Sequence, residues 1–332
     1  MNPVISVIIL TMNSERYIER CLRSLERQTL GDFEAVVIDA GSKDGTKKIF
    51  QRFGQRFTWL ELPGSDMGMA RNFGIRHSRG GYITFLDSDD FYLPTKLEVQ
   101  VASLKKNPGV DVTFCEAWHF RTERPDRLGL KKNPERQWSL RDFFAGHNRN
   151  LNTMCMRRAV WERGFTFGEG DRGRYGEEWR LQLSMAAAGV PMNYRAEPLA
   201  VVEIRPDSHT TWPRQWIMKS QAIAELERVA AQLTPIQLEQ VDCTAVMDTL
   251  RVKLVAALLL SGRRDQVAET VKKIATPQRA RQARLLWLAM RFIPAAWTKI
   301  LLCRLWLIFQ DRSFCWEATP AAVRPWLATR SG

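Results

Sequence analysis

The segment Gly81-Tyr82-Ile83-Thr84-Phe85-Leu86-Asp87-Ser88-Asp89-Asp90 is an apolar run that ends in a cluster of acids, and it gives the strongest indication of the fold. Two earlier runs have the same layout: Val4–Leu10 leads into Thr11-Met12-Asn13, and Phe33–Ile38 leads into Asp39-Ala40-Gly41-Ser42. Short β-branched runs separated by helical patterns predict parallel strands with crossover helices, and such sheets bind ligands at the carboxyl ends of their strands. The sequence therefore predicts an α/β fold in which these polar residues converge on one pocket.

The regions around these runs carry signals for further elements. Expected helices cover 14–30 after a Ser14 cap, 47–53, 69–78 and 175–188, and expected strands cover 58–62, 111–118 and 151–157. The polar stretch Arg121–Arg136 is expected to be a mobile surface loop near the pocket mouth. After about Trp212 the strand signal almost disappears, and Thr234-Pro235-Ile236-Gln237 reads as a capped helix start. We expect an α/β domain over 1–212 and a helical C-terminal domain over 213–332.

The composition indicates a globular protein with an anionic partner. The 332 residues are 45% hydrophobic, which is enough for a packed core, and carry a formal net charge of +13 with a pI of about 9.8. A basic chain suits a nucleotide, a lipid phosphate, a membrane surface or a nucleic acid, and charge alone does not choose among them. The six cysteines are scattered, which fits a reducing cytosol, and the N-terminal apolar run lacks the basic segment of a signal peptide.

The acids Asp87, Asp89 and Asp90 allow two interpretations. Two carboxylates one residue apart at a strand end repel each other, and a hard divalent cation that also holds a diphosphate relieves the repulsion. Alternatively, the acids cap the helix that begins near Leu93-Pro94. The apolar residues before and after the acids, such as Phe85-Leu86, narrow the choice between a cation site and a helix cap.

Four blocks of the chain, taken in order, resemble glycosyltransferase family 2, whose members are nucleotide-sugar enzymes of the GT-A fold. The blocks are Val7–Asn13, Val37–Thr46, Ala70–Ile75 and Gly81–Asp90, and a weaker match continues to about residue 212. The resemblance implies a Rossmann-like mixed sheet flanked by helices, followed here by an all-helical appendage. It also implies an inverting, metal-dependent transfer of a sugar from a UDP-sugar to a saccharide or lipid-linked glycan, in bacterial cell-surface polysaccharide synthesis.

The resemblance assigns nucleotide contacts to particular residues. The end of the first strand, with Thr11 and Asn13, would hold the uridine, and Asp39 would accept a hydrogen bond from the uracil imide. A competing base without that donor leaves a buried acceptor unpaired, at a cost of about 1–3 kcal/mol. Arg71 would lie against the base or the phosphate. The alternatives are a local turn for Asp39 and a surface helix charge for Arg71.

The resemblance also implies a Mn²⁺ or Mg²⁺ cofactor that neutralises the departing diphosphate. Asp89 would be a direct ligand, and Asp87, a second ligand, would lie nearer the ribose and sugar. His209 lies where a late contact to the metal or phosphate would come from, although a lone loop histidine is more often incidental.

An inverting transfer needs a general base on the acceptor side, and similar enzymes carry it in a Glu-Asp pair that starts a helix. Here Gly176–Leu181 follows that layout with Glu178 at the Asp position. The chain departs from the pattern by having Glu for Asp, Arg180 where an acid is common and Ser184 where Arg is common. Glu178 is the expected catalytic base, with Glu177 as the alternative. Both acids could instead complement a helix N-terminus.

The C-terminal stretch 279–330 is basic and rich in tryptophan. Nine basic and two acidic residues leave it with a net charge of +7, and it holds five tryptophans among leucine and isoleucine. A bilayer span over Leu285–Phe309 is disfavoured, because Arg291, Lys299 and Arg304 would each cost about 2.5–3.5 kcal/mol near its centre. The stretch suits either an anionic membrane surface, which would bring a lipid-linked acceptor to the pocket, or a helical bundle packed on the catalytic domain or a second subunit.

Other functions remain to be weighed against the enzyme. A non-catalytic nucleotide- or polyanion-binding protein with the same fold is the rival, prompted by Met12 where an aromatic residue is usual, by Ala40 where a second Asp is frequent, and by Arg180. Nucleic acid is disfavoured as a partner because the pocket end of the sheet is acidic. A dehydrogenase is disfavoured because Thr11-Met12-Asn13 is not a glycine-rich turn.

We expect a cytoplasmic protein that attaches peripherally to the inner membrane if its C-terminal stretch binds lipid. The sequence does not choose between a monomer and an oligomer.

Overall fold

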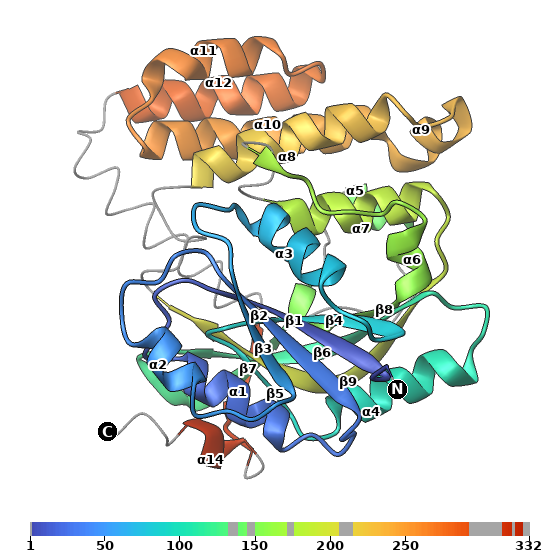
Figure 1. Cartoon of the computed structure of the whole chain (residues 1–332). Helices are drawn as coiled ribbons and strands as arrows, with labels where there is room; N and C mark the ends of the chain where they lie inside the picture. The colour runs from blue at the N-terminus through green and yellow to red at the C-terminus, as the bar shows by residue number, and fades with distance from the viewer. Residues whose placement is uncertain are drawn as a thin grey trace. The chain divides into compact units, whose positions relative to one another are not determined.

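The structure is a computed structural model that describes residues 2–131, 139–144, 150–170, 176–205, 215–291, 314–320 and 323–327. The chain forms two compact units, whose elements are labelled in Figure 1. Unit 1 comprises Met1–Gln137, Asn148–Arg205 and Cys315–Gly332, and unit 2 comprises Trp138–His147 and Pro206–Phe314. The predicted pocket residues Thr11, Asn13, Asp39, Arg71, Asp87, Asp89, Glu177 and Glu178 all belong to unit 1.

Unit 1 is built on a mixed, ten-stranded sheet in the described residues. The strands are β1 Ile5–Thr11, β2 Phe33–Asp39, β3 Phe57–Glu61, β4 Tyr82–Asp87, β5 Phe91–Tyr92, β6 Val112–Arg121, β7 Arg124–Lys131, β8 Met154–Arg157, β9 Met192–Ile204 and β10 Phe314–Ala318. Their order is β10-β7-β6-β8-β4-β1-β2-β3, and β9 pairs with β5 and β6. Because β1 to β4 are parallel, their carboxyl ends share one edge of the sheet.

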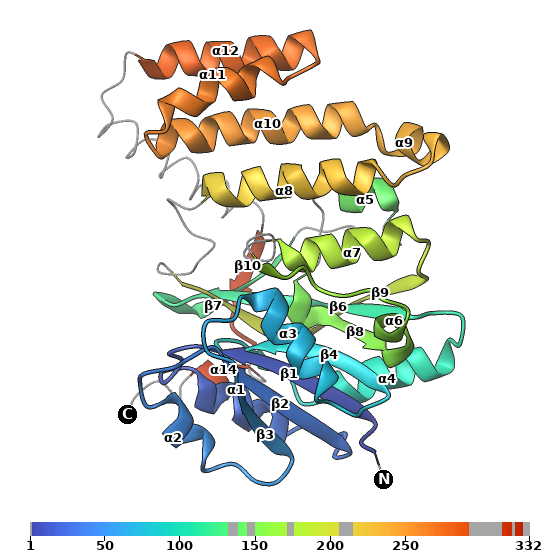
Figure 2. The same ribbon diagram turned by 45° about the horizontal axis from the view of Figure 1, so that its top comes forward.

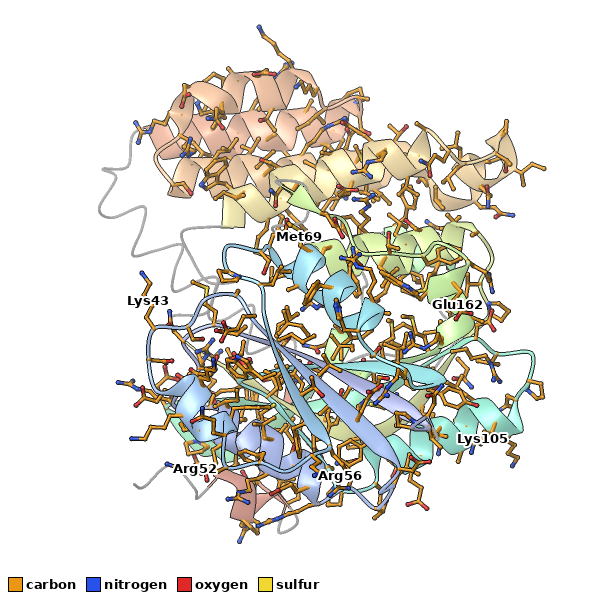
Figure 3. All side chains as sticks on the ribbon, viewed as in Figure 1. Lys43, Arg52, Arg56, Met69, Lys105 and Glu162 are labelled. Atoms are coloured by element: carbon orange, nitrogen blue, oxygen red, sulfur yellow. The ribbon has the colours of Figure 1, made fainter. Side chains whose placement is uncertain are left out.

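Helices cover both faces of this sheet, as the two views in Figures 1 and 2 show. They are α1 Ile18–Glu26, α2 Thr46–Phe50, α3 Met67–Arg76, α4 Lys96–Lys106, α6 Arg158–Glu162, α7 Glu177–Ala187 and α14 Arg324–Leu327, with a 3-10 turn, η1, at Leu151–Thr153. Side chains alternate along β1, so Val7 and Ile9 join a core with Leu22 of α1, while Ile8 joins a core with Ile75 of α3 and Leu181 of α7. Charged side chains such as those of Lys43, Arg52 and Lys105 project outward from the unit (Figure 3).

The structure corrects the predicted start of the first helix. Ser14 does not cap α1 with its side chain, because its Oγ lies 2.8 Å from the Oγ of Ser88, next to the aspartate cluster. Ser14 contributes to the start of the helix through its backbone carbonyl, which accepts a hydrogen bond from the Ile18 N–H at 2.9 Å. The helix also ends at Glu26, earlier than predicted. The Ser14 side chain, which the sequence predicted to be a helix cap, instead links the end of β1 to the end of β4 through Ser88.

The predicted loop over Arg121–Arg136 is also wrong in its described part. Arg124–Lys131 forms β7, which pairs antiparallel with β6 and lies beside β10. The letters RPDRLGLK have little strand propensity, so the strand depends on backbone pairing with its neighbours. Leu128 is fully buried, in a core with Trp118 and Val323, while most of the other described side chains of β7 are exposed. β10 contains the strand-favouring residues Phe314 and Trp316, but it is one short run in a stretch that otherwise carried almost no strand signal.

Unit 2 is helical in its described residues. Its helices are α5 Leu140–Phe144, α8 Gln215–Ala230, α9 Pro235–Val241, α10 Cys243–Leu260, α11 Arg264–Lys272 and α12 Pro277–Arg291. The capping box predicted at the start of α9 is confirmed, since the Thr234 and Gln237 side chains bond reciprocally to each other's backbone N–H. α10 packs against α8, α11 and α12 (Figure 2). The buried Asp248 of α10 accepts hydrogen bonds from the backbone N–H groups of Ala275 and Thr276 just before α12.

The basic, tryptophan-rich stretch is described in part. Its described pieces are α12, the residues 314–320 around β10, and the residues 323–327 around α14. Residues 292–313, with Trp297 and Trp306, lie outside the described part, as does His209. Among the helices that the structure describes, none has the length and apolar character needed to cross a bilayer.

A lysine is buried in the core of unit 1. The Lys96 ammonium donates to Thr84 Oγ1 at 2.8 Å and Gln100 Oε1 at 2.7 Å and lies 3.9 Å from the centre of the Tyr92 ring. Burial lowers the pKa of Lys96 to about 8, against the opposing effect of Cys115 and Cys155. Between about pH 8 and 10.5 the unfolded chain holds a proton on Lys96 that the folded protein lacks, so this residue makes stability rise with pH.

Replacing Lys96 with methionine is expected to remove that rise, which amounts to about 3 kcal/mol across this range. The groups facing Lys96 act oppositely, because burial raises the pKa of Cys115 to about 11, that of Cys155 to about 12 and that of Tyr92 well above its usual value. The test is therefore the difference in unfolding free energy between wild type and Lys96→Met, measured with urea from pH 7 to 10. A difference that stays constant with pH would contradict the prediction.

Candidate active site

The carboxyl ends of three strands lie side by side, as the sequence predicted. In the parallel register Thr11 at the end of β1 is paired with Asp39 of β2, and Leu10 is paired with Asp87 of β4. The polar residues that follow these strands therefore start from adjacent backbone positions. This edge is the candidate active site of unit 1.

The turns after β1 and β2 are tied together. Asp39, which is 5% exposed, accepts hydrogen bonds from the Ser42 N–H at 3.0 Å and from the Ser42 hydroxyl at 2.5 Å, so it does form the local turn considered as its alternative role. Asn13 adopts a left-handed backbone with φ 52°, and its Oδ1 accepts from the Lys43 N–H at 2.8 Å. Thr11 Oγ1 is buried and finds no hydrogen-bond partner among the described residues. An orphaned hydroxyl at this place suits a polar ligand.

Arg71 lies at the centre of the site instead of on the surface. It is 4% exposed, pairs with Glu177 Oε1 through Nη1, and contacts Asp87 Oδ1 through Nη2 at 3.2 Å. Burial alone would lower the pKa of the Arg71 guanidinium, but the carboxylates of Glu177, Asp87 and Glu178 outweigh it and raise the pKa. The structure therefore joins α3, β4 and α7 through one charged side chain.

The two adjacent glutamates have different environments. Glu177 is the first residue of α7 and is 3% exposed beside Arg71. Glu178 is half-buried, one position further along the first turn, and close enough to contribute to the raised pKa of Arg71. The helix starts after Gly176, whose φ of 84° favours glycine. Both acids therefore lie at a helix N-terminus, and only Glu178 keeps partial access to solvent.

The end of β4 and the turn that follows it, Asp87–Asp90, form an aspartate loop whose three carboxylates are incompletely compensated by positive charge. Asp89 contacts Arg205 at 2.8 Å, and burial together with the charge of Asp87 raises the pKa of Asp89 to about 6. Asp90 is 3% exposed, and burial followed by the charges of Asp89 and Asp87 raises its pKa well above the usual value. Negative charge is therefore in excess at this loop.

The donor set fits a hard divalent cation that keeps ligands from its substrate. In the described residues no group of three or more His, Cys, Asp or Glu side chains forms a complete metal cage. Mg²⁺ and similar ions are commonly held by one or two carboxylates with phosphate oxygens and water completing the shell. Asp87, which is partly exposed, and Asp89 supply such a pair, and their mutual repulsion favours a cation.

Several residues of the site were missed at the level of sequence. Arg205 and Glu203 at the end of β9, Arg20 of α1 and Asn152 of η1 all contact the aspartate loop. The pattern of neighbouring residues gives no signal for them, because each partner is distant in the chain; Arg20 and Glu203 are 183 positions apart.

A second missed feature is a clasp between α3 and the loop before α7. Asn72 donates through Nδ2 to the Phe167 carbonyl at 2.9 Å and to Glu169 Oε1 at 2.7 Å, and its Oδ1 accepts from the Phe167 N–H at 3.0 Å. Phe167 packs edge-on to Phe85, and its ring centre lies 5.4 Å from the Arg71 guanidinium carbon. The clasp thus helps to place Arg71.

Replacing Gly68 with alanine is expected to break this clasp, because the new Cβ would overlap the backbone carbonyl oxygen of Gly168. Overpacking of this kind costs about 1–3 kcal/mol of unfolding free energy, and backbone has less freedom to yield than a side chain. Urea unfolding measures the cost. Gly54→Ala is the matched control, since a Cβ there meets no atom within 4 Å. Equal stability of the two variants would show that the close approach is not required.

Residues 6–164 match the sequence model of the family described as Glycosyl transferase family 2. The segment from residue 6 to residue 164 is thus similar to the family 2 glycosyltransferases. The match contains the strand-end residues and Arg71, whereas Glu177, Glu178 and His209 follow it. A relative in Rickettsia typhi, the glycosyltransferase RT0329, is 33% identical over 138 residues, which are 42% of this chain and 43% of that protein. The matched segment therefore spans less than half of that relative.

Solved structures share the fold of this chain. TarS 1–349 of S. aureus in complex with UDP gives a TM-score of 0.58 at 16% identity, covering 87% of this chain and 89% of that one. The mannosyltransferase PcManGT from Pyrobaculum calidifontis, in complex with GDP-Man and Mn²⁺, gives 0.56 at 17% identity, covering 100% and 85%. At these identities the likeness concerns the fold alone, and it confirms the GT-A architecture that the four sequence blocks implied.

Proposed function

We propose that this protein is an inverting glycosyltransferase that uses a divalent cation and a UDP-sugar. The observation that carries the proposal is the meeting of Asp87, Arg71 and the first turn of α7 at the carboxyl ends of β1, β2 and β4, inside and next to the segment similar to family 2. A fold of this class places ligands at that edge of its sheet. Its acids and its buried arginine suit a reaction in which a diphosphate leaves.

The nucleotide half of the proposal rests on β1 and β2. Thr11, Asn13 and Asp39 would hold the uridine, and the orphaned Thr11 hydroxyl supports a polar ligand there. Asp39 already accepts from the N–H and the hydroxyl of Ser42, which orients its carboxylate, and a carboxylate has capacity left to accept from a uracil imide N–H. Arg71 would contact the base or a phosphate next to Asp87.

The metal half rests on the aspartate loop. Asp89 and Asp87 would hold Mn²⁺ or Mg²⁺, with His209 as a further candidate that lies outside the described residues. When bound, such a cation neutralises the charge that develops on the leaving diphosphate. Arg205 and Arg71 contact these two carboxylates and so limit their repulsion.

Glu178 is proposed as the general base, and Glu177 as the less favoured alternative. The Glu178 carboxylate would take the proton of an acceptor hydroxyl while that oxygen forms a bond to the anomeric carbon. The bond from the anomeric carbon to the diphosphate oxygen breaks, and its electron pair leaves with UDP. Glu178 is half-buried and borders the Arg71 cluster, whereas Glu177 is enclosed beside Arg71. A single displacement of this kind inverts the anomeric centre.

The acceptor is proposed to be a saccharide or a lipid-linked glycan of bacterial cell-surface polysaccharide synthesis, reached at the cytoplasmic face of the inner membrane. α12 supports an anionic surface as a partner, because Arg281 and Arg284 are exposed on it beside Leu285 and Leu288, which are 58% and 49% exposed. Cosedimentation with anionic and neutral vesicles tests this part of the proposal, and size-exclusion chromatography tests whether the protein forms oligomers.

Replacing Asp89 with alanine is expected to abolish turnover while the fold persists, because Asp89 is only partly buried and the loss of its charge relieves repulsion from Asp87. UDP release is measured with Mn²⁺, an acceptor extract and a panel of UDP- and GDP-sugars, with thermal shifts to identify the preferred donor. Wild-type protein that binds the nucleotide tightly but never releases UDP would favour the rival, a non-catalytic binding protein.

A further inference from the structure

A buried ion pair lies directly behind the aspartate loop. Arg20 of α1 donates through Nη2 to Glu203 Oε2 of β9 at 2.7 Å and to the backbone carbonyl of Asp89 at 2.6 Å. The side chains of Arg20 and Glu203 are 7% and 0% exposed. The guanidinium carbon lies 5.0 Å from the centre of the Phe91 ring and 5.5 Å from that of Phe120. The ion pair is therefore enclosed by apolar surface. Its bond to the aspartate loop goes to a backbone carbonyl and leaves the loop's carboxylates untouched.

The other end of the loop is held by a second set of bonds. Asn152, which is fully buried, accepts from the Asp87 N–H at 2.8 Å and donates to Asp90 Oδ2. Asp90 Oδ1 in turn accepts from the Glu203 N–H at 2.8 Å. The backbone is thus held at the Asp87 N–H and at the Asp89 carbonyl, on either side of the proposed metal ligands.

We propose that Arg20, whose buried charge Glu203 balances, is a positioning residue that sets the separation of the Asp87 and Asp89 carboxylates for a divalent cation. This inference rests on the proposed function. Arg71 and Arg205 contact the carboxylates themselves and therefore compete with a cation for them. Arg20 differs, because its charge faces Glu203 and its bond to the loop goes to a carbonyl. The pair can hold the loop without occupying the oxygens that a metal needs.

The rigidity has a physical consequence for metal affinity. Two carboxylates bind a cation tightly only when both oxygens are already at the right separation, and groups that orient metal ligands typically change affinity by about 10- to 100-fold when removed. A solely structural role would instead change stability and leave metal affinity of the folded protein unchanged. Two variants separate these roles.

The first variant is Glu203→Gln, which removes the negative partner but leaves Arg20 able to donate to the Asp89 carbonyl. The second is Arg20→Met with Glu203→Gln, which removes both charges and the bond to the loop, while methionine keeps apolar contact with Phe91 and Phe120. The uncompensated buried charge destabilises the first variant, and the neutral pair in the second relieves that cost. The double variant should therefore be more stable than Glu203→Gln, although it has lost the bond that anchors the Asp89 carbonyl.

The readout is Mn²⁺ titrated into each full-length protein with saturating UDP, followed by the electron paramagnetic resonance signal of free Mn²⁺. The double variant is expected to bind Mn²⁺ about 10- to 100-fold more weakly than wild type, although it melts at least as high as Glu203→Gln. Glu203→Gln is expected to keep near wild-type Mn²⁺ affinity. Equal Mn²⁺ affinity of the double variant and wild type would overturn the inference.

Arg20→Lys gives a second measurement if the double variant does not fold. Lysine keeps a positive charge beside Glu203 but shortens the side chain, so its hold on the Asp89 carbonyl is weaker. The Mn²⁺ affinity of the folded Arg20→Lys protein is therefore expected to fall. Unchanged affinity in Arg20→Lys would count against the inference. Wild-type protein that binds UDP yet retains no Mn²⁺ would overturn the metal dependence of the proposed function and this inference with it.

Discussion

Replacing Glu178 with glutamine is expected to lower kcat by about 10²- to 10⁴-fold, which is the usual contribution of a positioned general base. Glutamine has the same size and still accepts hydrogen bonds, but it cannot take up the proton of the acceptor hydroxyl. UDP and Mn²⁺ should bind as in wild type, because neither is assigned to Glu178. Turnover is measured by UDP release at saturating donor, and binding by calorimetry.

The adjacent glutamate supplies the matched control. Glu177→Gln makes the same chemical change one residue earlier, where the side chain is 3% exposed and paired with Arg71. We expect it to lower the unfolding free energy, because Arg71 loses a buried counter-charge, and to change kcat much less than Glu178→Gln does. The reverse ranking of the two kcat values would transfer the role of base to Glu177.

Replacing Arg71 with methionine is expected to have the largest effect on stability. It removes the cation that faces Glu177 and Asp87, and breaking a buried ion pair by removing one partner typically costs about 3–5 kcal/mol. UDP binding should also weaken, because Arg71 is the proposed contact to the base or phosphate. Thermal unfolding and UDP titration measure the two effects separately.

A double variant, Arg71→Met with Glu177→Gln, separates the structural effect from the binding effect. It removes both buried charges, so most of the lost stability should return. UDP affinity should remain about 10- to 100-fold below wild type, as expected for the loss of a charge-assisted hydrogen bond. A double variant that regains full UDP affinity would show that Arg71 serves the fold alone.

Local signals explain which parts of the fold were predictable. The strands at Val4–Leu10, Phe33–Ile38 and Tyr82–Leu86 are dense in apolar and β-branched residues, and the structure has β1, β2 and β4 there. The start of α9 carried its own capping pattern and formed as predicted. In contrast, β7 has weak strand propensity, and β10 is a single short run outside any repeated strand pattern. Both depend on pairing along the sheet, so their strand structure was not predictable from neighbouring residues.

The α/β character of unit 1 and the acids at the carboxyl ends of β2 and β4 follow from the amino-acid sequence alone, because hydrophobic period and strand-end polarity are properties of neighbouring residues. Three-dimensional packing was needed to settle which of two consecutive glutamates is enclosed beside Arg71, since that depends on how α7 packs against α3 and β4. It also decided that Arg20 and Glu203 meet behind Asp89. Burial and charge pairing arise from segments distant in the chain, and no local pattern encodes them.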